Sequence, residues 1–96
     1  MRFTFDPAKS EKNMAERGLP FALAAELDWA TALIVEDTRH DYGELRLRVL
    51  AVLHGRVHAA VVTPRNGELR VISFRKANRT EEKLYEQHTK TWPLAP

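Results

Sequence analysis

The sequence predicts a two-layer α+β domain, in which an antiparallel sheet packs against an N-terminal helical hairpin and a C-terminal helix follows. Two observations predict this class. Helix-start and helix-stop signals are concentrated at the two ends of the 96-residue chain. Between them, apolar runs follow one another with only short turns, which is typical of an antiparallel meander. The length suits one domain, which we expect at residues 1–90, with a C-terminal tail at 91–96.

The first part of the chain predicts a short strand and two helices. Residues 2–5 alternate between polar and apolar side chains, which favours a strand. Asp6 is a good N-cap and Pro7 suits the first helical position, while Gly18 is a typical helix end. Pro20 can open a second helix. Because the link between the two helices is short, they should form a helical hairpin.

The middle of the chain predicts a meander, and its end predicts a helix. Consecutive strands are predicted at residues 31–37, 45–53, 57–63 and 69–74. The clearest is 45–53, where one face is apolar throughout and the other begins charged. Asn78 should cap the last helix, since Glu81 stands three residues later as in a capping box. We expect Leu84 and His88, which are four residues apart, to face the core at helical spacing.

Composition points to an intracellular protein that contacts an anion. The net charge is only +2, but ten of the fifteen cations lie between Arg39 and Lys83, and most of these are arginine. Arginine suits bidentate contact with phosphate. The chain has no cysteine, which excludes disulfides and thiolate metal sites. It also has no signal peptide and no apolar run of about 18 residues, so we expect a cytoplasmic protein that does not enter a membrane.

Three cations flank the predicted junction between the last strand and the last helix. Arg75 and Lys76 end the strand, and Arg79 starts the helix. A helix N-terminus has free N–H groups and partial positive charge, so it already suits an anion. Cations at this position oppose the helix dipole, which suggests a use. The alternative is that they are ordinary solubilising charges.

A second charged segment, residues 36–46, joins two predicted strands. It contains His40, which can exchange protons near neutral pH, together with Glu44 and Arg46. The alternative interpretation is a solvated surface loop. On the neighbouring strands, Arg48 and Arg70 fall on polar positions. With Arg46 they could form a basic stripe across the open face of the sheet.

These residues could cleave RNA without a metal. Such a reaction needs a base for the 2′-hydroxyl, cations for the developing phosphate charge and an acid for the leaving oxygen. His40 or Glu44 could be the base, and His40, Lys76 or Tyr85 the acid, but the spacing leaves these roles open. The candidate catalytic residues are Arg46, Arg75, Arg79, His40 and Glu44, and the candidate RNA-binding residues are Arg39, Arg48, Arg70, Lys76 and Tyr85.

No cofactor or metal is predicted. The chain has no phosphate-binding glycine loop and no His-Glu-x-x-His motif. His54 and His58 flank a turn but lack a third ligand at useful spacing.

Five ordered segments of the chain resemble the BrnT family of toxins from bacterial type II toxin–antitoxin pairs. They are residues 5–9, the set Asn13, Gly18 and Phe21, residues 37–46, residues 72–77 and residues 81–85. The resemblance implies a RelE-like fold and a ribonuclease activity that blocks translation; with the metal-free chemistry above, we expect a metal-independent endoribonuclease. The resemblance also implies an RNA substrate and a BrnA-type ribbon-helix-helix antitoxin that masks the basic face. Such a pair would bind promoter DNA only through the antitoxin.

Two other interpretations use the same fold. In one, the chain is a noncatalytic RNA- or protein-binding module that serves as antitoxin partner and co-repressor, and it needs neither His40 nor Glu44. In the other, it is an inactive toxin relic that keeps only the partner role.

Overall fold

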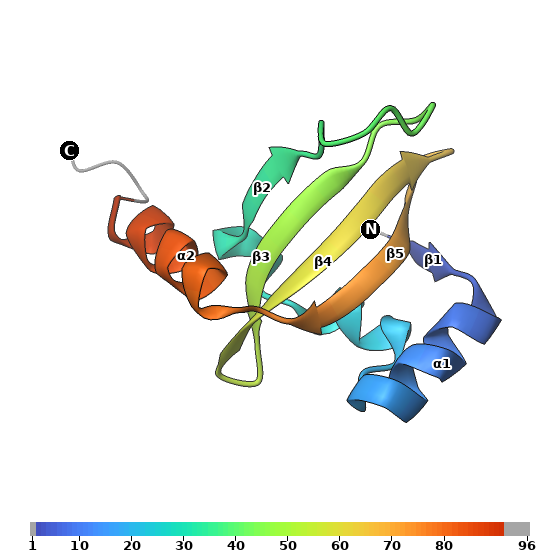
Figure 1. The fold of residues 1–96 in the computed structure, drawn as a ribbon, viewed down its shortest axis with the longest axis horizontal. Helices are drawn as coiled ribbons and strands as arrows, with labels where there is room; N and C mark the ends of the chain where they lie inside the picture. Colours follow the sequence, from blue (N-terminus) through green and yellow to red (C-terminus); the bar gives the residue numbers. More distant parts are fainter. Residues whose placement is uncertain (1, 92–96) are drawn as a thin grey trace.

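A five-stranded sheet organises the computed structural model, which describes residues 2–91 (Figure 1). The elements in chain order are β1 (Phe3–Phe5), α1 (Pro7–Arg17), the 3₁₀ helices η1 (Phe21–Glu26) and η2 (Trp29–Thr31), β2 (Leu33–Glu36), β3 (Leu47–Leu53), β4 (Arg56–Arg65), β5 (Glu68–Lys76) and α2 (Arg79–Thr91). The strand order is β1-β5-β4-β3-β2. The predicted α+β class is confirmed. Most of the predicted C-terminal tail, residues 92–96, lies outside the described residues.

The sheet is mixed, so the prediction of a purely antiparallel sheet is wrong in one place. Strands β2 to β5 form the expected antiparallel meander. Strand β1 instead lies beside β5 and runs parallel to it, with Phe3 opposite Leu69 and Phe5 opposite Val71. A tight turn forces neighbouring strands to be antiparallel, but β1 leads into α1 and has no such turn to β5. Its direction is therefore set by long-range packing.

The predicted helical hairpin is also wrong. The first helix forms as expected: Asp6 caps it by accepting a hydrogen bond from the Ala8 N–H at 2.9 Å, and Gly18 ends it at a φ of 69°. The second segment is the short 3₁₀ helix η1. Its buried side chains, Phe21, Ala24 and the following Leu27, are spaced by three. In a 3₁₀ helix residues i and i+3 lie in line, so this spacing turns all three toward the sheet.

The core lies between η1 and one face of the sheet. The side chains buried there come from η1 and its flanks and from alternate positions of the central strands. They are Leu19, Phe21, Ala24, Leu27, Val49, Ala51, Leu53, Ala60, Val62, Val71 and Phe74. The alternation of β3 that the sequence predicts is therefore confirmed, with its odd-numbered residues on the core face.

A β-bulge in β5 changes which residues face the core. Val61 pairs with Ser73, but the next residue, Val62, pairs with Val71, so Ile72 is an extra residue in the strand. As a result Val71 and Phe74, three positions apart, both point into the core. The Ser73 side chain points to the opposite face of the sheet.

Helix α2 lies across one end of the other face, which we call the open face (Figure 1). The prediction that Leu84 faces the core is wrong, because its side chain is half exposed. Tyr85, one position further, is buried, and its hydroxyl lies 3.0 Å from the Thr31 hydroxyl. The helix is thus rotated by about one residue, or ~100°, from the predicted orientation. No helix in the described part of the chain is long and apolar enough to cross a membrane.

The Asn13 side chain links α1 both to the segment that follows it and to strand β5. The Asn13 side-chain amide donates to the Leu19 carbonyl at 2.7 Å and to the Phe74 carbonyl at 2.9 Å. Asn13→Ala leaves both partly buried carbonyls without this donor, so the free energy of unfolding should fall by about 1–3 kcal/mol. Urea unfolding monitored by circular dichroism measures this. The neighbouring control, Lys12→Ala on the exposed face, should change it by less than about 0.5 kcal/mol.

Candidate anion-binding site

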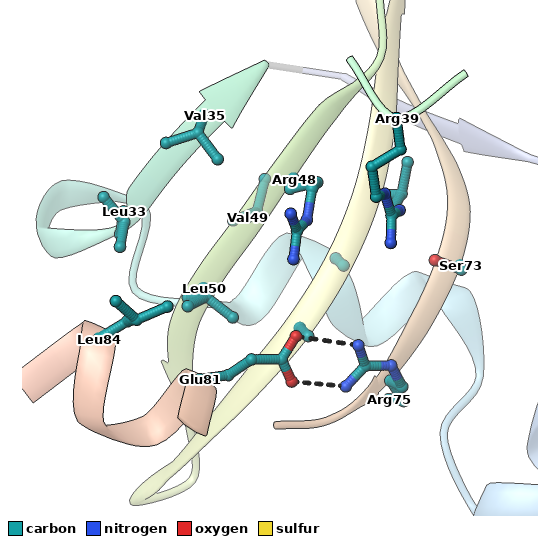
Figure 2. A pocket seen from close by; sticks show the side chains of 13 residues that line it. Leu33, Val35, Arg39, Arg48, Val49, Leu50, Ser73, Arg75, Glu81 and Leu84 are labelled. Atoms are coloured by element: carbon teal, nitrogen blue, oxygen red, sulfur yellow. Dashed lines mark hydrogen bonds and ion pairs between the residues drawn. The ribbon is translucent and has the colours of Figure 1, made fainter. Parts of the chain in front are cut away.

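The open face contains a pocket of about 220 Å³ next to the start of α2 (Figure 2). Its charged side chains are Arg39, Arg48, Arg75 and Glu81. Its apolar side is aliphatic and consists mainly of Leu33, Val35, Leu50 and Leu84. The pocket therefore combines three guanidinium groups with one carboxylate and an apolar wall.

Arg75 and Glu81 form a two-pronged ion pair at one end of the pocket (Figure 2). Arg75 Nη1 donates to Glu81 Oε1 at 2.7 Å, and Nη2 donates to Oε2 at 2.9 Å. The ion pair lowers the pKa of Glu81 below its ordinary value and raises that of Arg75. Because the carboxylate is only 9% exposed, this ion pair fixes the position of the guanidinium.

The same carboxylate caps helix α2, which confirms the predicted capping box. Glu81 Oε1 accepts the Asn78 backbone N–H, and Asn78 Oδ1 accepts the Glu81 N–H, both at 2.9 Å. The anion at this helix N-terminus is therefore a side chain of the protein itself. The sequence prediction of a free anion site at the helix start has to be corrected in this respect.

Arg39 is held at the pocket by a second carboxylate, that of Asp37. Arg39 Nε and Nη2 donate to the two Asp37 oxygens at 2.8 Å each, and the Arg39 backbone N–H donates at 3.2 Å. The Tyr42 hydroxyl adds a fourth hydrogen bond at 3.2 Å. These donors, first of all the Arg39 side chain, hold the pKa of Asp37 well below its usual range.

Asp37 was absent from the candidates derived from the sequence. Its side chain is 1% exposed, so its carboxylate is available only to these protein donors. The available signal was the spacing Asp-x-Arg at a strand end, where an Asp side chain commonly bonds the backbone two residues on. That signal predicts a turn, but it does not predict which face the arginine reaches.

Arg48 is the third cation of the pocket and differs from the other two. Figure 2 shows its side chain on the same face as the Arg75–Glu81 pair. Within residues 2–91 it has no hydrogen bond or ion pair, although its charge helps to lower the pKa of Glu81. Its guanidinium donors are therefore available to a ligand.

The other predicted residues of the 36–46 segment lie outside the pocket lining. Arg46 Nε donates to Glu44 Oε2 at 3.2 Å, and its guanidinium carbon lies 4.1 Å from the centre of the Tyr42 ring. Arg65 donates to the other Glu44 oxygen at 2.7 Å. Hydrogen bonding, mainly from Arg65, lowers the pKa of Glu44, which weakens it as a base. His40 packs edge-on against Tyr42.

The three cations at the strand–helix junction do not converge on the pocket. Arg75 lines the pocket. Lys76 instead pairs in register with His58, which lies on the core face beside Phe74, so the Lys76 side chain points away from the pocket. Arg79 lines a separate hollow along α2 with Glu82, Lys83 and Glu86. Two further predicted RNA-binding residues also lie outside the pocket lining. Arg70 pairs with Thr63 on the open face. Tyr85 lies on the buried side of α2.

Within residues 2–91, no group of three or more histidine and carboxylate side chains is arranged to hold a metal ion.

The fold and the pocket define a small α+β protein with three arginines clustered on the open face of its sheet. A comparison with protein families identifies it further. Residues 5–81 match the family described as the ribonuclease toxin BrnT of type II toxin–antitoxin systems. The chain belongs to this family and is therefore a ribonuclease toxin, which makes it an enzyme with an antitoxin partner and an RNA substrate. No curated protein sequence matches the chain. The resemblance seen in the sequence is confirmed, and the matched segment includes Arg39, Arg48, Arg75 and Glu81.

The Glu81 contacts predict a pH-dependent contribution to stability. Because the pKa of Glu81 is lower in the folded protein than its ordinary 4.5, the folded state binds fewer protons than the unfolded state near that pH. Its contribution should be full above about pH 5.5 and decline as the pH falls below about 4.5. The unfolding free-energy difference between wild type and Glu81→Gln should therefore shrink between pH 6 and pH 3. Glu16→Gln, at an exposed surface pair, should show a small difference at every pH.

Proposed function

We propose that the pocket of Arg39, Arg48 and Arg75 binds the scissile phosphodiester of RNA and that the protein is a metal-independent endoribonuclease. The observation that carries this proposal is the set of free guanidinium donors in the pocket. Arg48 has no protein partner in the described part of the chain, and the other two arginines are already oriented by carboxylates. Preorganised donors of this kind stabilise charge that develops on a phosphate, usually the largest catalytic contribution.

The proton-transfer residues belong to the same proposal. His40 and Glu44 stay the proposed candidates for moving protons at the 2′-hydroxyl and the leaving oxygen. Of the two, His40 is favoured, since the ion pairs of Glu44 with Arg46 and Arg65 keep that carboxylate ionised and occupied. Arg46, Arg79, Lys76, Arg70 and Tyr85 stay predictions, and their positions outside the pocket lining favour roles in holding the RNA or the fold.

The cellular role follows from toxin chemistry. We propose that the toxin acts in the cytoplasm, where RNA cleavage inhibits translation. A BrnA-type ribbon-helix-helix antitoxin would neutralise it by covering the arginine pocket, and the pair would bind promoter DNA through the antitoxin. The aliphatic wall beside the arginines supports this, because an antitoxin segment with apolar and acidic side chains would complement both.

Arg48 provides the most direct test. Arg48→Gln removes the cation that has no carboxylate partner among the described residues, so it should leave the fold intact and lower the rate of RNA cleavage by about 10²–10³-fold. Mapping of RNA 5′ ends after a brief pulse of expression measures the loss. The matched control is Arg17→Gln, an exposed arginine at the end of α1, which should cleave like wild type. Full cleavage by Arg48→Gln would contradict the proposed site.

A second comparison separates the two arginines of the strand–helix junction. Arg75→Ala should lower cleavage by about 10²–10³-fold because it removes a cation from the pocket. Arg79→Ala should lower it by less than about tenfold, since Arg79 lines a separate hollow. The double variant should be harmless when expressed. Circular dichroism must show that Arg75→Ala is folded, because it leaves Glu81 without its partner. Equal losses from both single variants would place the phosphate at the helix start instead.

A further inference from the structure

Two buried carboxylates from distant parts of the chain hold two of the three pocket arginines. Asp37 follows β2 and Glu81 lies in the first turn of α2. Their side chains are 1% and 9% exposed, and each binds its arginine through both oxygens. A two-pronged contact fixes the plane of a guanidinium as well as its position.

The two carboxylates occupy different edges of their arginines, and each leaves donors free. Asp37 takes the Nε and Nη2 edge of Arg39, which leaves both Nη1 hydrogens. Glu81 takes the Nη1 and Nη2 end of Arg75, and the Lys76 carbonyl accepts from Nη1 as well. Arg75 thus retains Nε–H and one Nη2 hydrogen, which are donors on one edge. No acceptor contacts these donors in the part of the chain that the structure describes.

The carboxylates also set the charge of the pocket. Three arginines contribute three positive charges, and two ionised carboxylates cancel two of them, which leaves a single positive charge. An internal phosphodiester has a single negative charge, whereas a terminal phosphate approaches two at neutral pH. The pocket therefore balances an internal phosphodiester.

We propose that Asp37 and Glu81 are positioning residues of the ribonuclease: each fixes one arginine with a free pair of donors, and together they match the pocket to an internal phosphodiester of RNA. The proposal rests on the proposed function of the pocket. Neither residue contacts the reacting atoms, and each acts through the arginine that it holds.

Both carboxylates have structural roles too, and amide variants separate these from positioning. In Asp37→Asn the side-chain oxygen can still accept the Arg39 backbone N–H, and in Glu81→Gln it can still complete the capping box. An amide offers one acceptor and one donor, however, so its NH₂ group opposes the second guanidinium N–H. The fold should survive while the orientation of the arginine is lost.

The experiment compares Asp37→Asn and Glu81→Gln with wild type and with Glu68→Gln, a control at the Arg2–Glu68 surface pair. Cleavage of a short RNA gives kcat and KM. Binding of a 2′-O-methyl RNA of the same sequence, which cannot be cleaved by 2′-hydroxyl attack, is measured across a range of salt concentrations. Thermal melting shows that each protein is folded at the assay temperature.

Positioning predicts a split between catalysis and binding. In both variants kcat should fall by at least about tenfold, the cost of one lost charge-assisted contact in the transition state. Binding of the 2′-O-methyl RNA should tighten, with a salt dependence steeper by up to about 0.7, because each variant adds one net positive charge. Glu68→Gln should change neither kcat nor the binding of the 2′-O-methyl RNA and its salt dependence.

Two outcomes would overturn the proposal. The first is the result expected from a purely structural role. In that case kcat falls only in proportion to the fraction of protein that is folded, while RNA binding per folded molecule and the salt dependence of that binding stay unchanged. Unchanged kcat in folded variants, with cleavage still lost in Arg48→Gln, would remove the positioning role and leave the proposed function standing. Normal cleavage by Arg48→Gln would instead overturn the proposed function itself. If one variant does not fold, the other gives the same test.

Discussion

The ion pair between Arg75 and Glu81 connects the parts of this protein that form its pocket. It joins the last strand of the sheet to the helix that follows, and the same carboxylate caps that helix. Helix α2 is held at its other side by the contact of Tyr85 with Thr31, so its start and its middle are both anchored. The pocket lies between these anchors and the open sheet face. Without the ion pair, the helix would keep its capping box, but the end of the pocket nearest α2 would lose its fixed cation.

Clustered arginines raise a physical problem that this arrangement solves. Like charges at short range repel, and uncompensated cations at a helix start oppose its dipole. The protein places carboxylates behind Arg39 and Arg75 and leaves Arg48 open. Part of the repulsion is thereby offset in the free protein, while donors remain for a ligand. Sites of this type commonly trade some stability for function, and the buried carboxylates limit that loss here.

Local patterns in the sequence predicted the elements that local physics determines. The alternation in 45–53 and the capping box of Asn78 and Glu81 depend on neighbouring residues, and both are present as predicted. The parallel pairing of β1 with β5 depends on contacts across most of the chain, and no local period encodes it. The sequence could not distinguish the 3₁₀ helix η1 from an α-helix, because apolar residues three apart also suit one side of an α-helix.

In the candidate site, too, the sequence predicted which residue types take part but not how they come together. Arg39, Arg48 and Arg75 could be selected from residue type and clustering, since arginine suits phosphate. Their convergence could not be predicted, because it depends on strand register and on a loop folded around Asp37. Lys76 and Arg79 are close to Arg75 in sequence, yet alternation of the strand and the start of the helix turn them elsewhere.

The bulge at Ile72 has a consequence for how this family can vary in length. Val71 faces the core and Ser73 the open face only because one extra residue shifts the strand's alternation between them. Loss of Ile72 would join Val71 directly to Ser73 in a regular ladder, so Arg70 and Arg75 would stay on the faces that they occupy now. A one-residue change in length that the bulge does not absorb would instead turn the side chains on one side of it to the opposite face. In evolution, single-residue length changes are therefore expected at the bulge and in the turns that connect the strands, where they leave the faces of β5 unchanged.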